Sequence, residues 1–390
     1  MNIGIFTNAY HPITSGVVNA IDCIRQGLSR LGHEIYIIAP RYSGYDDRDD
    51  HVIRVPSIRL TRKADFPLPI PYFSKLEKKI SALELDIVHT QHPFLLGALA
   101  EKIAAKKNIP LVFTFHTQYE IYLHYAPFFI PEALSRWYIR RTVSSHIKHC
   151  NAVVVPAPSI LPAVAEYGGE SKCHVIPNAI KVEKFSGGNG ERIRSHYHLQ
   201  NSKILIFVGR MAEEKNLSFL LAAFKKINNT SPETVLLLVG GGPTLDKLKK
   251  EAEALGLSHR VIFTGMVPYD EIPDYLKASD IFVMASTSEV KPLSLLESMA
   301  SGLPIVAVRA PGAVDTVTDG QDGLLVNENT DEFAAAVIGL LKDLNRLEQM
   351  SKNASNKANK FGIPEFGKKL EELYKELLLE RVNHKADRIK

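Results

Sequence analysis

The sequence predicts an α/β protein made of two doubly wound domains that face a cleft, followed by C-terminal helices. Short apolar runs rich in β-branched residues alternate with longer amphipathic runs. Such short runs, apolar on both sides, are typical of strands buried in a parallel sheet. The alternation stops at a turn-rich stretch and then restarts, and a length of 390 residues suits two domains. Ligands of such sheets lie outside the carboxyl ends of the strands.

The first domain is predicted to span residues 1–177. Its first strand continues into a helix, and strand-like and helix-like runs then follow one another. Strands are expected at 2–7, 34–39, 86–90, 111–115 and 152–155, and helices at 17–31 and 93–106. Residues 178–190 end in a glycine-rich turn sequence and are predicted to form a linker.

The second domain is predicted to span residues 191–360. Strands are expected at 203–209, 234–240, 260–265, 280–285, 304–308 and 323–326, and helices at 216–229, 243–255, 331–343 and 345–359. Residues 361–390 are predicted to form a last helix, over 365–380, that packs back on the first domain. The polar tail after Arg381 is expected to fray.

Composition excludes several classes of protein. Three cysteines without paired spacing indicate neither a disulfide framework nor a thiolate metal site, which fits the cytoplasm. The N-terminus lacks the pattern of a signal peptide, and no apolar run is long enough to span a membrane. The net charge of +4 is too small to indicate nucleic acid binding, but residues 1–177 hold 19 Lys and Arg against 15 Asp and Glu, so the excess lies in the first half.

Two turns between a strand and a helix are candidate phosphate-binding loops. Ser15 and Gly16 begin the first helix, where backbone N–H groups and the helix dipole favour an anion. In the second domain, Gly209 and Arg210 follow a strand, and Lys215 precedes Asn216, a predicted N-cap. Two cations in one loop suit a diphosphate leaving group. Ordinary βα turns and solvated surface cations are the alternatives.

Two further segments carry candidate ligand contacts. Gly240, Gly241 and Gly242 follow a strand, and they either cradle phosphate or allow close packing. Glu289 lies in a loop before a helix that Pro292 is expected to start, and Glu297 lies in the second turn of that helix. Two such carboxylates can accept hydrogen bonds from sugar hydroxyls and from a ribose diol. A cap region with a surface glutamate is the alternative.

The spacing Glu-x7-Glu at 289–297, the motif Gly-Arg-x4-Lys-Asn at 209–216, the Ser15-Gly16 loop and the segment 113–117 resemble the retaining glycosyltransferases of family 4. The resemblance covers essentially the whole chain, and it implies the GT-B fold. It also implies that no metal or other cofactor is required and that a nucleotide diphosphate sugar is the donor substrate.

The resemblance assigns roles to individual residues. Arg210 and Lys215 are expected to bind the diphosphate, Glu297 the ribose and Glu289 the donor sugar. His116 and Gly16 are expected beside the sugar and the phosphate, although a lone histidine after a strand is commonly structural. The full predicted set is catalytic His116, Arg210, Lys215 and Glu289, and donor-binding Ser15, Gly16, Gly209, Gly241, Met266, Val267, Lys291, Leu293 and Glu297.

One feature departs from a simple match. Residues 290–292 read Val-Lys-Pro where the family usually has a small or glycine-containing triplet, and proline supplies no N–H. Two explanations stand: Lys291 compensates by reaching a phosphate or an acidic acceptor, or the donor preference has changed. The acidic run 46–50 resembles a metal site, but a solvated loop is the preferred interpretation.

The segment 115–125 resembles that of family members that glucosylate diacylglycerol. The predicted acceptor contacts are Tyr119, Glu120, Tyr122 and His124, and an aromatic core is the alternative.

The segment 131–148 predicts a basic helix with the only tryptophan of the chain. Arg136, Trp137, Arg140 and Arg141 are expected to contact an anionic membrane surface. Residues 59–72 add a second basic and apolar stretch. A helix packed on its own sheet with a solvated cationic face is the alternative.

The resulting hypothesis is a retaining hexosyltransferase that transfers glucose from a UDP-linked donor to a membrane lipid such as diacylglycerol, at the inner face of the cell membrane. The rivals are a transferase with a soluble sugar or metabolite acceptor and a non-catalytic nucleotide-sugar-binding subunit. A dinucleotide oxidoreductase is disfavoured because no Gly-x-Gly-x-x-Gly follows a strand.

Overall fold

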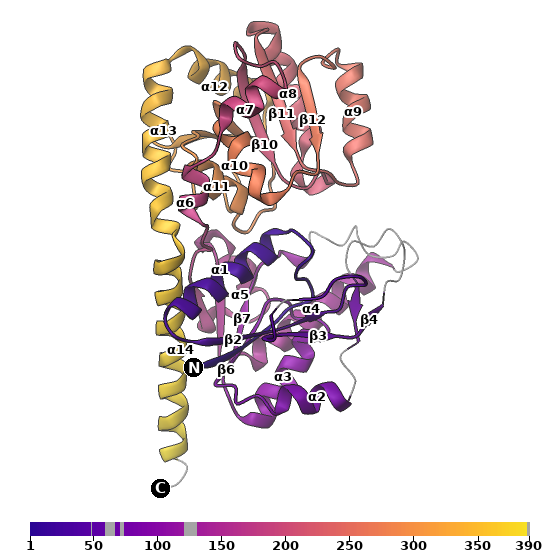
Figure 1. Cartoon of the computed structure of the whole chain (residues 1–390), viewed down its shortest axis with the longest axis vertical. Coiled ribbons are helices and arrows are strands. Elements are labelled where there is room, and N and C mark those ends of the chain that lie inside the picture. The colour runs from indigo at the N-terminus through magenta and orange to yellow at the C-terminus, as the bar shows by residue number, and fades with distance from the viewer. Residues whose placement is uncertain (48, 59–66, 71–73, 121–130, 388–390) are drawn as a thin grey trace. The chain divides into compact units, whose positions relative to one another are not determined.

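The computed structural model describes residues 1–47, 49–58, 67–70, 74–120 and 131–387. It divides the chain into two units (Figure 1): unit 1 comprises residues 1–179 and 363–390, and unit 2 comprises residues 180–362. Each unit contains a parallel sheet whose strands are joined through helices. The predicted α/β fold class is therefore confirmed.

The sheet of unit 1 has the order β3-β2-β1-β6-β7-β8-β9. Its strands are β1 (Asn2–Phe6), β2 (Glu34–Pro40), β3 (Val52–Val55), β6 (Ile87–Thr90), β7 (Leu111–Thr114), β8 (Ala152–Val155) and β9 (Cys173–Val175). From β1 the chain moves outward to β3, and from β6 it moves outward to β9 on the other side. The carboxyl ends of β1 and β6 therefore flank a topological switch point, where ligands of such sheets bind.

Helices and a small hairpin complete unit 1. They are α1 (Gly16–Arg30), the pair β4 (Ser57–Ile58) and β5 (Leu68–Pro69), α2 (Ser74–Ser81), α3 (Leu96–Lys107), α4 (Glu132–His149), α5 (Leu161–Ala165) and α14 (Ile363–Asp387). The sequence analysis did not predict β3, β9, α2 or α5, because these elements are short and carry little periodic signal.

The last helix of the chain returns to unit 1. In Figure 1, α14 (yellow) lies along α1 (indigo), and Phe366, Leu370 and Tyr374 join the core around β1 and β2. The Tyr374 hydroxyl is also 2.7 Å from His89 Nδ1 in β6. The helix α14 thus supplies part of the core of unit 1 from the far end of the sequence.

The sheet of unit 2 has the order β12-β11-β10-β13-β14-β15, with a switch point between β10 and β13. Its strands are β10 (Lys203–Val208), β11 (Thr234–Val239), β12 (Val261–Gly265), β13 (Ile281–Met284), β14 (Ile305–Val308) and β15 (Gly323–Val326). Alternate residues enter two different core clusters: Ile204 and Ile206 belong to one, and Leu205 and Phe207 to the other. Both faces of the sheet are therefore buried, as the apolar runs predicted.

The helices of unit 2 are α6 (Val182–Ser186), α7 (Gly190–His196), α8 (Leu217–Thr230), α9 (Leu245–Ala254), α10 (Ile272–Lys277), α11 (Leu293–Ala300), α12 (Thr330–Lys342) and α13 (Leu344–Ala358). The predicted linker 178–190 contains α6 and the fully buried Phe185, and from Ile180 onward it belongs to unit 2. Two of its glycines lie close to α10, because a Cβ on Gly188 would lie 2.6 Å from the Pro273 carbonyl oxygen and one on Gly190 would lie 2.5 Å from the Lys277 carbonyl oxygen.

Candidate functional site

The switch point of unit 2 brings together two predicted catalytic residues. Lys215 lies in the loop after β10, and Glu289 lies in the loop after β13, the neighbouring strand. Their side chains form an ion pair between Nζ and Oε1, and each is less than one fifth exposed. The structure thus places a cation and a carboxylate side by side at the sheet edge where α/β proteins bind ligands.

The loop after β10 also presents the second predicted cation. Arg210 is exposed directly after Gly209, and the short turn Glu213–Lys215 then leads into α8. Asn216 occupies the N-cap position of α8, but its side chain does not cap the helix. Its backbone is left-handed, and its Nδ2 donates to Glu328 Oε1 at 2.7 Å. Asn216 is therefore the N-cap residue of α8, as predicted, but without a capping hydrogen bond from its side chain.

The glycines after β11 allow their loop to pack closely against the loop after β10. A Cβ on Gly240 would lie 2.1 Å from the Gly209 carbonyl oxygen, and one on Gly242 would lie 2.2 Å from that of Met211. These two glycines therefore support the close-packing interpretation. A Cβ on Gly241 would lie 3.3 Å from Met266, whose side chain is 75% exposed, and Val267 packs partly against the core.

Glu297 is almost completely buried in α11, with 4% of its surface exposed. The Tyr269 hydroxyl donates to its Oε1 at 2.6 Å, and Lys184 Nζ lies 3.9 Å from the Tyr269 ring centroid. Burial raises the pKa of Glu297 to about 7, although the Tyr269 hydrogen bond and the Lys184 charge act in the opposite direction. Pro292 stands one residue before α11 rather than in its first turn, while Leu293, the first helical residue, is buried.

Lys291 points into unit 2 rather than into solvent. Its side chain is only 7% exposed, its Nζ donates to the Asp315 carbonyl oxygen at 3.3 Å, and it lies 4.9 Å from the Phe361 ring centroid. Burial lowers its pKa to about 8, against the opposing effect of Asp315. The Lys291 ammonium thus contacts the Asp315 carbonyl oxygen and the Phe361 ring of its own unit. This differs from the expectation that it reaches a phosphate or an acceptor.

In unit 1, Ser15 and Gly16 lie at the start of α1. Ser15 is the N-cap, and its Oγ accepts a hydrogen bond from the Val18 N–H at 3.3 Å. A Cβ on Gly16 would meet no atom within 4 Å, so the backbone there faces open space. Arg54, which no sequence motif singled out, braces the loop before α1 by donating to the His11 carbonyl oxygen at 2.7 Å.

The acidic run that precedes β3 forms ion pairs with basic side chains. Asp47 accepts two hydrogen bonds from Arg54, and Asp49 pairs with Arg25 and His51. Within the described part of the chain, no group of three or more His, Cys, Asp or Glu side chains is arranged to hold a metal ion.

His116 follows β7 at the same sheet edge as the Ser15 loop. Its Nε2 lies 2.6 Å from Oε1 of Gln91, which follows the adjacent strand β6. Burial, together with nearby His92 and His89, lowers the pKa of His116 to about 3, so its imidazole is neutral at physiological pH. Gln91 was not among the predicted site residues, although its position directly after a predicted strand was a usable signal.

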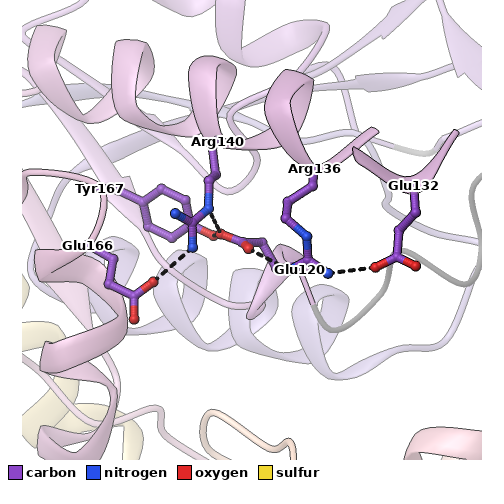
Figure 2. Close-up of polar contacts among 6 residues, drawn as sticks. All are labelled: Glu120, Glu132, Arg136, Arg140, Glu166 and Tyr167. Carbon is purple, nitrogen blue, oxygen red and sulfur yellow. Dashed lines mark hydrogen bonds and ion pairs between the residues drawn. The ribbon is translucent and has the colours of Figure 1, made fainter. Parts of the chain in front are cut away.

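The predicted acceptor residues have distinct environments. Tyr119 is 8% exposed and packs edge-on against Phe94 and Phe115, as in an aromatic core. Glu120 lies between α4 and Tyr167, as Figure 2 shows. Tyr122 and His124 lie outside the described residues.

The carboxylate of Glu120 is bound by three donors. It accepts from Arg136 at 2.9 Å, from Arg140 at 2.7 Å and from the Tyr167 hydroxyl at 3.1 Å (Figure 2). Burial alone would raise the pKa of Glu120, but these hydrogen bonds outweigh it and lower the pKa. Arg136 and Arg140, two of the four predicted membrane residues, therefore have their charges balanced within the protein.

The remaining surface of α4 is apolar and cationic. Leu134, Trp137 and Tyr138 are each more than half exposed, and the Arg141 guanidinium lies 5.6 Å from the Trp137 ring centroid. The second predicted basic stretch, 59–72, falls largely outside the described residues. Among the helices that the structure describes, none combines the length and hydropathy needed to cross a membrane.

Known proteins match the chain over almost its whole length. Residues 14–184 match the family Glycosyltransferase Family 4, and residues 190–357 match Glycosyl transferases group 1. The alpha-monoglucosyldiacylglycerol synthase of Streptococcus pneumoniae is 31% identical over 97% of this chain and 86% of its own length. A protein of the same name from Acholeplasma laidlawii is 31% identical over 97% of this chain and 98% of its own.

The fold is also similar to that of a solved structure. Anabaena HepE, crystallised with UDP and glucose, superposes with a TM-score of 0.77 and 18% identity, over 96% of this chain and all of that one. With the two family matches and the two parallel-sheet units, these similarities show that the chain belongs to the GT-B glycosyltransferases, as a hexosyltransferase with a family 4 N-terminal half and a group 1 C-terminal half.

Proposed function

We propose that this enzyme transfers glucose from UDP-glucose, with retention of configuration, to diacylglycerol or a related lipid at the inner face of the cell membrane. The observation that carries the proposal is the similarity to two alpha-monoglucosyldiacylglycerol synthases, each 31% identical over 97% of this chain. The Lys215–Glu289 pair at the switch point of unit 2 supports the same chemistry.

The proposed donor contacts follow from charge and position. Arg210 and Lys215 bind the diphosphate, because fixed cations stabilise the charge that develops on a leaving group. When the diphosphate takes Lys215, the Glu289 carboxylate is released to accept hydrogen bonds from sugar hydroxyls. Glu297 accepts hydrogen bonds from the ribose diol.

The other predicted donor residues complete the proposed contacts. Ser15 and Gly16 place open backbone N–H groups at a helix N-terminus beside the phosphates. Gly209, Gly241, Met266 and Val267 supply backbone and apolar contacts to the nucleotide, and Leu293 supports Glu289. Neutral His116 contacts the sugar. Lys291 keeps the loop that carries Glu289 in place through Asp315 and Phe361.

The proposed chemical step is a front-face substitution. The bond between the sugar C1 and the phosphate oxygen breaks, and a bond from C1 to the acceptor hydroxyl oxygen forms on the same face. The hydroxyl proton passes to the departing phosphate oxygen, so no separate protein base is needed. The protein contributes orientation and electrostatic stabilisation, and no residue assignment includes a metal.

The acceptor side is assigned to unit 1. Tyr119, Tyr122 and His124 are the proposed acceptor contacts. The Glu120 carboxylate is engaged by three donors, so we assign it to balancing the charges of Arg136 and Arg140 rather than to binding an acceptor hydroxyl. On α4, Trp137 and Arg141 contact the membrane surface, and Arg136 and Arg140 contribute less because Glu120 balances them.

The test is release of nucleotide diphosphate and the mass of the product, across UDP- and GDP-hexoses, with and without diacylglycerol in anionic vesicles. We expect a monoglucosylated lipid from UDP-glucose only when vesicles are present. Turnover that does not depend on lipid would point to a soluble acceptor. Donor binding without turnover would point to a non-catalytic subunit.

A further inference from the structure

Gln91 occupies the switch point of unit 1 and is completely buried. It follows β6 directly, beside the end of β1, and its backbone N–H donates to the Phe6 carbonyl oxygen at 2.9 Å. Its backbone is therefore fixed between two adjacent strands at the sheet edge where ligands bind.

The two polar atoms of the Gln91 side chain have different environments. Oε1 lies 2.6 Å from His116 Nε2, whereas the amide Nε2 is buried without a hydrogen-bond partner. A buried donor that stays unpaired lowers stability, so native proteins leave few of them. An unpaired amide beside the histidine assigned to the sugar indicates that a ligand oxygen completes its hydrogen bonding.

The chemistry of the neighbouring groups limits which ligand fits. Burial lowers the pKa of His92 to about 4 and that of His89 to about 3, so both rings near His116 are neutral, as His116 itself is. Without a fixed positive charge, these three rings and Gln91 suit an uncharged hydroxyl rather than a phosphate. A hydroxyl oxygen can accept from the amide of Gln91.

We propose that Gln91 is a specificity-determining contact for the transferred sugar, in which Oε1 fixes the ring of His116 and Nε2 donates to a sugar hydroxyl. This inference rests on the proposed function, in which His116 contacts the donor sugar. It adds a residue that binds the sugar and not the nucleotide.

The first test compares UDP with UDP-glucose in Gln91→Met, which keeps the length of the side chain and removes both polar atoms. We expect UDP affinity within about twofold of wild type and kcat/KM for UDP-glucose about tenfold lower, because one neutral hydrogen bond is lost. Wild type should also discriminate against one deoxyglucose analogue of the donor, and Gln91→Met should lose that discrimination. An equal loss for UDP and UDP-glucose, or an unchanged kcat/KM, would overturn the proposal.

A second variant keeps the shape of the side chain and changes its charge. Gln91→Glu retains an acceptor for His116 but loses the donor, and its carboxylate favours the imidazolium form. We expect the acidic limb of the pH–rate profile to move to higher pH, which a merely structural role would not produce. An unshifted profile would contradict the assigned contact with His116.

The control is Thr234→Val, which removes another fully buried and unpartnered polar atom, Oγ1 at the start of β11. This variant should melt close to wild type and keep full kcat/KM. Wild-type protein that turns over no nucleotide sugar would refute the proposed function itself. Active wild type with an unaffected Gln91→Met would refute only the role of Gln91.

Discussion

At the scale of single residues, the ion pair between Lys215 and Glu289 connects stability with the proposed chemistry. Both side chains are more than four fifths buried, so removing one of them takes away the charge that compensates the other and destabilises the fold by about 3 kcal/mol. One group that stabilises a developing charge changes kcat by about 10²–10³-fold. We therefore expect Lys215→Ala and Glu289→Ala to lower the melting temperature by several degrees and, at temperatures where the variants are still folded, to lower kcat by about that factor. Turnover in the vesicle assay and thermal unfolding measure the two quantities.

The neighbouring Lys247 provides a matched control. It pairs with Glu213 in the same loop region, and both side chains are more than half exposed. Lys247→Ala should leave both turnover and melting temperature unchanged. Near-normal turnover in Lys215→Ala or Glu289→Ala, or an equal loss in Lys247→Ala, would contradict the assignment of the pair.

Glu297 predicts a pH dependence of stability. Its pKa rises from 4.5 to about 7 on folding, so the folded chain keeps a proton that the unfolded chain has lost between these values. The free energy of unfolding therefore falls as pH rises through this window, by roughly 3 kcal/mol at most. Compared with Glu297→Gln, wild type should lose stability between about pH 5 and about pH 8. Urea unfolding at both pH values tests this difference.

The control for Glu297 is Glu348→Gln. Glu348 is an exposed helix residue paired with Lys352, and this pairing lowers its pKa. Glu348→Gln should therefore not become more stable relative to wild type as the pH rises, which is the change expected for Glu297→Gln. Parallel stability curves for wild type and Glu297→Gln would show that Glu297 does not hold the extra proton.

At the scale of elements, the sequence predicts most of what periodicity encodes. The buried strands and long helices were identifiable because their apolar residues repeat with a period of two or 3.6 or form short continuous runs. The edge strand β3 and the short helix α6 were not predicted, because such segments are fixed by the tertiary contacts of residues such as Phe185. Lys291 illustrates the same limit, since its sequence position suggested a ligand contact but its partners, Asp315 and Phe361, are distant in sequence.

The packing of α14 on α1 depends on two facing glycines. A Cβ on Gly367 would lie 2.8 Å from the backbone carbon of Gly27, too close for the helices to keep their separation. We expect Gly367→Ala to destabilise the protein by about 1–3 kcal/mol. By contrast, Gly339→Ala in α12, where a Cβ meets no atom within 4 Å, should stabilise it by about 0.5–1 kcal/mol. Chemical denaturation measures the free energy of unfolding of both variants. A change of the same sign in both would contradict the close approach of Gly367 to Gly27.

The exposed face of α4 makes a prediction about membrane binding. Trp137 is 56% exposed, and an aromatic side chain that leaves water gains about 1.5–3 kcal/mol. Trp137→Ala should therefore weaken binding to anionic vesicles about tenfold. Arg136→Ala should weaken it less, because Glu120 and Glu132 already neutralise that guanidinium. Vesicle sedimentation measures both, and a larger effect of Arg136→Ala would show that α4 binds through charge alone.

At the scale of the whole molecule, the two units differ in how the chain builds them. Unit 2 is continuous from residue 180 to 362, and its two core clusters draw only on those residues. Unit 1 is assembled from both ends of the chain, and α14 supplies Phe366, Leu370 and Tyr374 to its core. The order of the motifs predicts two domains, and the last helix was expected to pack back on the first one. The individual residues of α14 that enter the core, such as Phe366, Leu370 and Tyr374, could not be identified from its weakly patterned sequence.

This difference predicts how fragments behave. A fragment of residues 180–362 should fold alone with a cooperative thermal transition, because it keeps its whole core. A fragment of residues 1–179 should not, because the loss of several large apolar side chains costs more free energy than the usual margin of stability.

The fragment 180–362 also tests where the nucleotide binds. If Arg210, Lys215 and Glu297 bind the nucleotide as proposed, UDP should raise the melting temperature of the fragment 180–362, by an amount that grows with ligand concentration. Circular dichroism and thermal shift measure both properties. Cooperative folding of 1–179 would show that α14 is dispensable, and a folded 180–362 that UDP does not stabilise would remove the nucleotide from unit 2.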